Sequence, residues 1–143
     1  MLIDEKDKAL LALLSDNSRE STAELARKLG LSRSTVKDRI ERLERRGIIT
    51  GYTVRFSESY VQGQIQAHVM INADPKKVTQ IISSLRKMPQ VKSLYTVNGV
   101  HDMLALLSAE STKSLDETLD QIGEMQGVEK TVSSIILSTK FEK

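Results

Sequence analysis

The sequence of 143 residues contains no cysteine, no tryptophan and only two histidines. Without thiols the chain can form no disulfide, no thiolate nucleophile and no Cys-ligated zinc site, and such a composition suits a reducing cytoplasm. With two histidines we expect no dedicated metal site and no cofactor. Three Tyr and two Phe are the only aromatic residues, too few for the stacking platform that binds single-stranded nucleic acid.

Long apolar runs are also missing, since none approaches the roughly 18 residues of a membrane span. The N-terminus, Met1 to Glu5, lacks the basic start and apolar stretch of a secretory signal. Hydrophobic residues make up 39% and charged residues 28%, as in soluble globular proteins. We therefore expect a cytoplasmic protein without a membrane partner.

A local basic cluster lies behind the small net charge of +2. Residues 61–143 carry nine basic and nine acidic side chains, whereas residues 27–46 alone carry eight basic and three acidic ones. Such a cluster predicts a localised anionic partner. The i,i+4 spacing predicts the ion pairs Asp38–Arg42 and Glu41–Arg45. By this count the unpaired cations are Arg33, Lys37, Arg39 and Arg46.

Helical periodicity predicts three helices, over residues 4–15, 22–29 and 33–46. Asp4 and Ser32 are placed to cap the first and third, and Ser21 with Glu24 forms a capping box at the second. Gly30 ends the second helix and Gly47 the third.

The spacing of Ala26, Gly30 and Val36 at i, i+4 and i+10 is typical of a helix-turn-helix. A small residue lets the helices cross closely, glycine permits the turn, and a β-branched residue fills the angle. The third helix can then lie in a major groove of double-stranded DNA. Its first residues (Arg33, Ser34, Thr35 and Lys37) are expected to face base edges, and Arg39, Arg45 and Arg46 to face phosphates. The full set of candidate DNA-binding residues is Arg33, Ser34, Thr35, Lys37, Asp38, Arg39, Arg42 and Arg46. The alternative is a merely solvated charged helix.

Residues 48–56 are predicted as a strand, either a wing or the start of a connection, and residues 57–64 as a polar linker. The domains expected are therefore a helix-turn-helix at 1–50, a connecting strand and linker at 51–64, and a second domain at 65–143.

That second domain contains an internal repeat at an offset of 37 residues. Each unit reads strand, helix, strand, which gives the ferredoxin-like βαββαβ arrangement and an α+β fold. The strands are expected at 65–71, 92–97, 103–107 and 131–138, with helices from Asp74-Pro75 to near Lys87 and over 112–124. The sheet face away from the helices still carries Ala67, Val69 or their neighbours, so we expect self-association to cover it.

The turn between the two repeats, Val97 to Asp102, contains Asn98-Gly99, a strong hairpin signal. It can be a simple turn. It can also bind a zwitterion, with backbone amides near Gly99 holding a carboxylate and Asp102 holding an ammonium group.

The chain resembles the Lrp/AsnC (feast/famine) family of transcription regulators. The matching stretches are Ile3-Asp4 with Asp7, Leu25-Ala26 with Leu29-Gly30-Leu31-Ser32, Val36 with Arg39-Ile40, Leu43-Glu44, Gly47-Ile48-Ile49, Val97 to Asp102, and Gly127-Val128 with Thr131. The resemblance implies DNA binding by the helix-turn-helix and dimerisation by the ferredoxin-like domain, with dimers often assembled into octamers or similar rings.

It also implies an amino acid or related metabolite as effector, bound between C-terminal domains. The implied effector residues are Thr96, Asn98, Gly99, His101, Asp102, Ser134, Ile135 and Ile136. Asn98 stands where Thr or Ser is usual, and His101 where an aromatic residue is common. An enzymatic alternative stays open, because sirohaem decarboxylases resemble the same two-domain chain.

Overall fold

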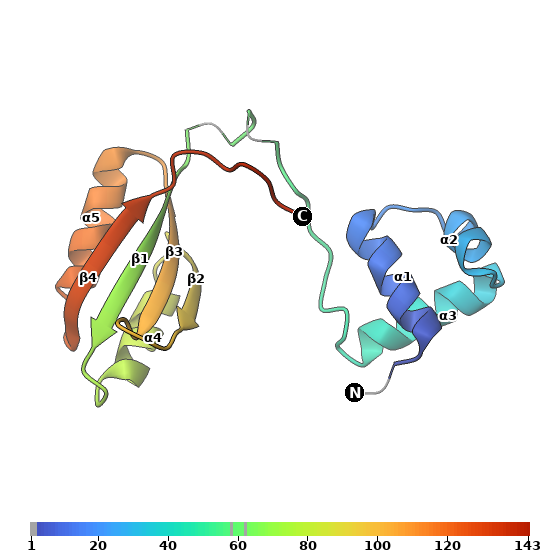
Figure 1. Cartoon of the computed structure of the whole chain (residues 1–143), viewed down its shortest axis with the longest axis horizontal. Coiled ribbons are helices and arrows are strands. Elements are labelled where there is room, and N and C mark those ends of the chain that lie inside the picture. Colours follow the sequence, from blue (N-terminus) through green and yellow to red (C-terminus); the bar gives the residue numbers. More distant parts are fainter. Residues whose placement is uncertain (1–2, 58, 62) are drawn as a thin grey trace. The chain divides into compact units, whose positions relative to one another are not determined.

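The computed structural model describes residues 3–57, 59–61 and 63–143. The described chain divides into two compact units, residues 1–55 and 56–143 (Figure 1). The expected limits of the first domain and of the linker include Met1, Leu2, Glu58 and Gln62, which lie outside the described residues.

The first unit consists of three helices whose starting points are fixed by local capping. They are α1 (Glu5–Asp16), α2 (Thr22–Leu29) and α3 (Arg33–Arg45). Asp4, Ser21 and Ser32 each accept a hydrogen bond of 2.8–3.2 Å from the backbone N–H three residues further on. The predicted caps are thus confirmed, because a side-chain oxygen here satisfies an amide that the helix leaves unpaired.

The turn between α2 and α3 has the geometry that the glycine spacing predicts. Gly30 adopts φ +66° and ψ +37°, a left-handed conformation that favours glycine. The N–H of Leu31 then donates to the carbonyl of Ala26 at 2.9 Å and closes the end of α2. Buried side chains from all three helices form one core: Leu10, Leu14, Leu25, Ala26, Leu29, Val36 and Leu43.

The strand predicted over residues 48–56 is wrong. The N–H groups of Ile48 and Ile49 both donate to the carbonyl of Leu43, at 3.0 and 3.2 Å, and so finish α3. Residues 51–57 belong to no strand. Among the described residues no second strand pairs with them, and an extended segment without a ladder partner leaves its backbone groups to water.

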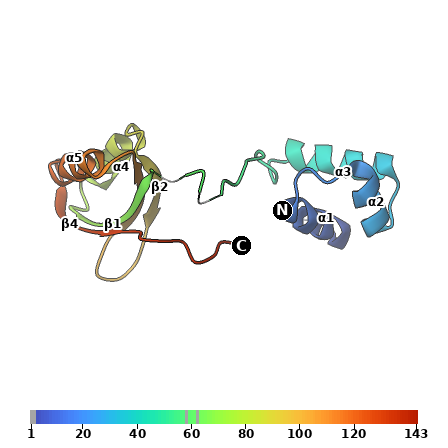
Figure 2. The ribbon, with the colours of Figure 1, turned by 90° about the horizontal axis from the view of Figure 1, so that it is seen from above.

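The second unit is a four-stranded antiparallel sheet with two helices. Its elements are β1 (Ile65–Ala73), α4 (Val78–Arg86), β2 (Val91–Thr96), β3 (Met103–Ala109), α5 (Thr112–Gly123) and β4 (Val128–Ile135). The strand order β2-β3-β1-β4 confirms the ferredoxin-like arrangement and a central position for β3. Figure 2 shows both helices on the same side of the sheet.

Several boundaries differ from the sequence prediction. The strands β1 and β3 each extend two residues beyond the predicted ends, and β2 begins and ends one residue earlier. The larger differences are in β4 and α4. The fourth strand ends at Ile135 rather than 138 and begins at Val128, where it meets Ala73 beyond an irregularity in the β1–β4 register. Helix α4 begins at Val78, because residues 75–77 form a turn in which Asp74 Oδ1 accepts the N–H of Lys76 at 3.0 Å.

The helix-covered face is the one that carries Ala67 and Val69, each fully buried. The expectation that these residues or their neighbours lie on the open face is therefore wrong for Ala67 and Val69 and right for their neighbours, because successive strand residues point to opposite faces. By pairing register, the open face carries Gln66, His68, Met70 and Asn72 of β1, Leu104, Leu106 and Ser108 of β3, Ser93 and Tyr95 of β2, and Lys130, Val132 and Ser134 of β4.

Gly127 occupies a tight position between α5 and β4. Its φ is +97°, and a Cβ there would collide with the Lys77 side chain and lie 3.2 Å from Ile81 Cδ1. Its carbonyl accepts the N–H of Asp74 at 2.8 Å, so the backbone is held against the turn that precedes α4.

We predict that Gly127→Ala destabilises the second unit by about 1–3 kcal/mol from backbone strain, with the collision in addition. Gly123→Ala is the matched control, because Gly123 ends α5 with open space around its Cα, where alanine favours the helix. Urea unfolding followed by NMR signals from β1 and β3 measures both. Equal midpoints for the two variants would contradict the prediction.

Candidate nucleic-acid interface and ligand site

Helix α3 is buried on one side through Val36 and Leu43, both 0% exposed. Each residue of a helix turns the chain by about 100°. Side chains two positions from a buried one therefore point to nearly the opposite side. The exposed residues of this outward face are Ser34, Asp38, Glu41 and Arg45, and the exposed Lys37 lies at its border, about 100° from Val36.

The Arg39 side chain is turned toward α1. Its Nη1 lies 2.8 Å from both carboxylate oxygens of Asp4 and 2.9 Å from Asp7 Oδ1, and the side chain is 20% exposed. The expectation that Arg39 is an unpaired cation is therefore wrong. Its hydrogen bonds to Asp4 and then Asp7 raise the pKa of Arg39, and the hydrogen bond from Arg39 holds the pKa of the Asp4 carboxyl below its usual range.

Asp7 is the centre of this network, with only 2% of its side chain exposed. Besides Arg39, it contacts Arg42 through an Nη2–Oδ2 distance of 3.3 Å. Next to it, the ammonium group of Lys6 donates to the carbonyl of Leu29 at 2.6 Å. The start of α1 thereby holds both α3 and the end of α2.

The ion pairs predicted within α3 do not form among the residues that the structure describes. Arg42 contacts Asp7 instead of Asp38, and Glu41 has no ion pair with Arg45. The two exposed carboxylates of the outward face, those of Asp38 and Glu41, are thus left without a cationic partner in the described chain.

In the folded chain, fewer cations of the basic cluster (residues 27–46) remain without an ion pair than the sequence suggests. Arg27 forms an ion pair with Glu24 at 2.6 Å, and Lys28 forms one with Glu20 at 3.4 Å. The carboxylate of Glu24, which was expected to complete the capping box with Ser21, is therefore engaged by Arg27. With Arg39 and Arg42, four of the eight cations are therefore matched by carboxylates outside residues 27–46. The exposed cations of α3 with no ion pair among the described residues are Arg33, Lys37 and Arg45.

Two other candidate DNA-binding residues take part in the helix cap. The Ser32 hydroxyl lies 2.7 Å from the Thr35 hydroxyl and 3.2 Å from that of Ser34. Ser34 is exposed and Thr35 half-buried. Their hydroxyls therefore stand at the start of α3, beside Arg33 and on the solvent side.

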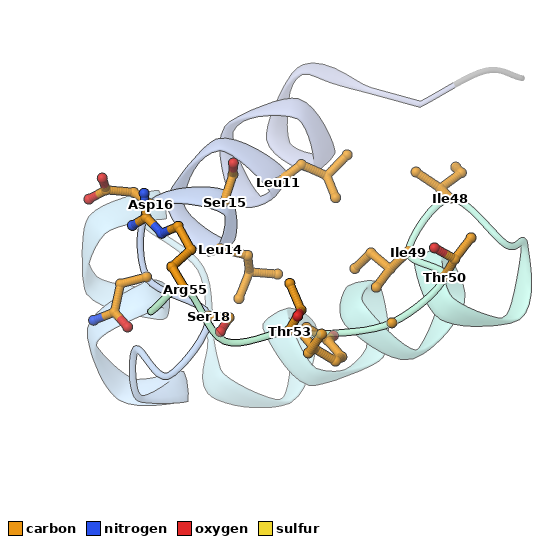
Figure 3. Close-up of a pocket in the computed structure, with 13 residues that line it drawn as sticks. Leu11, Leu14, Ser15, Asp16, Ser18, Ile48, Ile49, Thr50, Thr53 and Arg55 are labelled. Carbon is orange, nitrogen blue, oxygen red and sulfur yellow. The ribbon is translucent and has the colours of Figure 1, made fainter. Parts of the chain in front are cut away.

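A hollow of 540 Å³ lies elsewhere in the first unit, between the end of α1 and the chain that follows α3 (Figure 3). Leu11 and Leu14 line it from α1, and Ile48 and Ile49 line it from the opposite segment. None of the candidate DNA-binding residues lines this hollow.

In the second unit, the turn between β2 and β3 is tied to the end of β1. The N–H of Asp102 donates to the carbonyl of Ile71 at 3.0 Å, and Asp102 Oδ2 accepts the N–H of Ala73 at 2.8 Å. Gly99 has φ +109°, while Asn98 has no positive φ, so glycine alone supplies the left-handed residue. Asp102 thus holds the end of the central strand β1 as well as presenting a carboxylate.

His101 is joined to β1 by a residue that sequence reasoning missed. Its Nδ1 lies 2.6 Å from Asn72 Oδ1, and Asn72 Nδ2 donates to the carbonyl of Val100 at 2.8 Å. No signal in the sequence pairs Asn72 with a residue 29 positions away.

The remaining predicted effector residues do not meet this turn within one chain. Thr96 is next to it and pairs with Met103, whereas Ser134 pairs with His68 and Ile135 with Ala67. The N–H of Ile136 donates to the carbonyl of Gln66 at 2.8 Å. His68 and Ala73 are five positions apart on β1, a distance of about 16 Å along the strand.

Among the described residues, no group of three or more His, Asp or Glu side chains is arranged to hold a metal ion. In the same residues, no helix has the length and apolar content required to span a membrane.

Comparison with known families decides what these two units are. Residues 3–50 match the family model for winged helix-turn-helix DNA-binding domains, and residues 66–143 match that for the Lrp/AsnC ligand binding domain. The chain belongs to the Lrp/AsnC family. This member is accordingly a transcription regulator with a DNA-binding helix-turn-helix and a ligand-binding domain.

Similar proteins match nearly the whole of this Lrp/AsnC chain. It is 35% identical to the HTH-type transcriptional regulator LysM of Saccharolobus solfataricus, over 97% of this chain and 96% of that protein. It is 33% identical to the regulator LrpA of Pyrococcus horikoshii, over 95% and 97%. A transcriptional regulator of Neisseria meningitidis, solved as a complex with L-Met, has a TM-score of 0.88 at 26% identity and covers 99% of this chain and 94% of its own.

The pairing of Asp4 with Arg39 predicts an acid-sensitive contact in this regulator. Asp4→Asn keeps the N-cap, since Asn caps as well as Asp, and removes the charge. A carboxyl whose pKa is lowered in the folded state contributes stability above its unfolded pKa, and that stability is lost as the pH falls through the folded value. The wild type should therefore be more stable than Asp4→Asn at pH 7, and the difference should disappear as the pH falls through the lowered pKa of the Asp4 carboxyl.

Urea unfolding at several pH values, followed by NMR signals from α1 and α3, measures this difference. Glu5→Gln is the control, because Glu5 is 89% exposed and its pair with Lys8 is a surface contact, which contributes little. A pH-independent difference between Asp4→Asn and the wild type would contradict the prediction.

Proposed function

We propose that the chain is a homodimeric, sequence-specific regulator that reads double-stranded DNA with the first turn and the outward face of α3. The observation that carries this is the set of exposed cations, Arg33, Lys37 and Arg45, that no described carboxylate neutralises. Such cations release counterions from phosphates and supply the salt-dependent part of DNA affinity. Arg46 is exposed at the end of α3, and we keep it as a phosphate contact.

The proposed role of Arg39 changes, because its guanidinium already binds two carboxylates. We assign Arg39 to positioning α3 rather than to holding a phosphate. Arg42 also positions α3 through its contact with Asp7. Its side chain is 40% exposed, so it can still reach the major groove of the DNA.

The open sheet face supports the dimer. Met70, Leu104 and Leu106 are only half-buried there and Tyr95 is 54% exposed. An apolar sheet face without a covering layer favours a self-complementary contact. Two copies would place two α3 helices in successive major grooves about 34 Å apart, and dimers of this kind would assemble further into an octamer or similar ring.

We propose a regulator rather than a sirohaem decarboxylase. The relatives above are named as transcription regulators, His101 is engaged by Asn72, and His68 lies on the open sheet face proposed for the dimer. A DNA partner also supports a cytoplasmic location.

For the effector, we propose an amino acid at the β2–β3 turn. The exposed Asp102 carboxylate has Oδ1 available for an ammonium group while Oδ2 accepts from Ala73, and the turn around Gly99 offers backbone amides for a carboxylate. The neighbour from Neisseria meningitidis binds L-Met. The other proposed effector residues, Ser134, Ile135 and Ile136, lie beside the start of β1, at the opposite end of the sheet from this turn. They would therefore reach this ligand from another copy of the chain.

The DNA prediction concerns Arg33. Arg33→Ala should relax base preference at one position of each half-site and cost about 1–3 kcal/mol there, while the affinity of the wild type falls steeply with salt. Selection of bound fragments from a random DNA pool, at two salt concentrations, measures both. Two half-sites about one helical turn apart would be enriched by a dimer.

Arg39→Gln serves as comparison, because it should weaken binding to all sequences equally by loosening α3. A wild type that enriches no sequence would contradict the proposed function. Equal loss on all sequences for Arg33→Ala would make Arg33 a phosphate contact instead.

The effector prediction separates the two roles of Asp102. Asp102→Asn retains an oxygen that can accept the Ala73 N–H but removes the charge, so the fold and effector-free DNA binding should survive. Loss of a charged hydrogen bond, about 1.5–3 kcal/mol, should weaken amino-acid binding roughly ten- to hundredfold. Calorimetric titration of both proteins with the twenty amino acids measures it. No binding by the wild type, or unchanged binding by Asp102→Asn, would contradict the zwitterion site.

A further inference from the structure

We infer that Asp38 and Glu41 determine base specificity by accepting hydrogen bonds from the N4 amino groups of two cytosines in the half-site. This inference rests on the proposed reading of DNA by α3. It assigns a base-reading role, which no phosphate contact explains, to Asp38, already a candidate DNA-binding residue, and to Glu41, which was not one.

The positions of the two carboxylates place them in the middle of the outward face. Asp38 comes two residues after Val36, and Glu41 two residues before Leu43, and both hydrophobic residues are fully buried. At about 100° per residue, each carboxylate points about 160° away from a core side chain. Both residues are exposed, and both line an open hollow of 440 Å³ on the helix surface.

Neither carboxylate is neutralised within the described chain. Arg42, which could pair with Asp38 at i,i+4, is instead held by Asp7 at 3.3 Å. The buried Asp7 carboxylate requires cationic partners more than an exposed one does, because it has lost its hydration. Asp7 therefore keeps Arg42 away from Asp38, and Glu41 has no ion pair among the described residues.

A free carboxylate in a major groove is selective because phosphates surround it. Its charge is repelled by both DNA strands, so it is tolerated only where a base offers a hydrogen-bond donor. Cytosine presents its N4 amino group with no acceptor beside it, whereas adenine places N7 next to its amino group. Guanine presents two acceptors, and thymine an acceptor and a methyl group. Cytosine is therefore the base that a carboxylate favours.

The spacing of the two residues fits neighbouring bases. Three residues along a helix rise by about 4.5 Å, close to the 3.4 Å between successive base pairs. Asp38 and Glu41 should therefore read cytosines in adjacent or alternate base pairs, on either strand.

The test is selection of bound fragments from a random DNA pool with the full-length wild type, Asp38→Asn and Glu41→Gln. The wild type should enrich cytosine at two positions of each half-site. Each variant should lose on the order of tenfold in cytosine preference at one position and gain adenine there, since Asn and Gln pair with adenine. Glu44→Gln is the matched control: it removes the same charge from α3 at only about 100° from Leu43 and should leave the selected sequence unchanged.

Affinity for DNA of random sequence provides a second readout. Asp38→Asn and Glu41→Gln should bind it more tightly than the wild type, because repulsion by phosphates is relieved, while their affinity for the wild-type site falls. A merely structural role would lower both affinities. Enrichment of a wild-type site whose bases do not change in either variant would overturn this inference alone, whereas failure of the wild type to enrich any site would overturn the proposed function.

Discussion

The Asp7 carboxylate sets the arrangement of the DNA-binding unit. It is 2% exposed and has two guanidinium partners on α3, Arg39 and Arg42. A buried carboxylate is costly unless it is paired and hydrogen-bonded, so α3 is held in the rotation that brings both arginines to α1. That rotation decides which side chains remain outward. The composition of the outward face of α3 therefore depends in part on Asp7, a residue of another helix.

In the second unit the corresponding constraint is the alternation of side chains along the strands. Both helices cover the face that carries Ala67 and Val69, so His68 and Met70 necessarily point to the other side. The same pairing fixes the two ends of the sheet. Asp102 is tied to Ala73 at one end, and Ile136 to Gln66 at the other. The residues proposed for the effector are thus divided between the two ends of the sheet.

The elements that the sequence predicted well are those decided by local interactions. Helix α2 begins and ends as expected, because a serine cap and a left-handed glycine mark its limits within ten residues. The strand expected at 48–56 and the limits of β4 were wrong, because a strand is defined by its partner. Residues 51–57 have none among the described residues, and β4 takes its start from Ala73, far away in the chain.

The sequence by itself determined the helix caps, the turn at Gly30, the ferredoxin-like repeat and the family resemblance, since each depends on spacing along the chain. Tertiary structure alone decided which charges meet. Arg39 is 35 residues from Asp4 and 32 from Asp7, and His101 is 29 from Asn72. Helical spacing pairs residues only within one helix, whereas these contacts require that core packing first bring two elements together. For that reason the sequence predicted an ion pair between Arg42 and Asp38, whereas in the folded chain Arg42 pairs with Asp7.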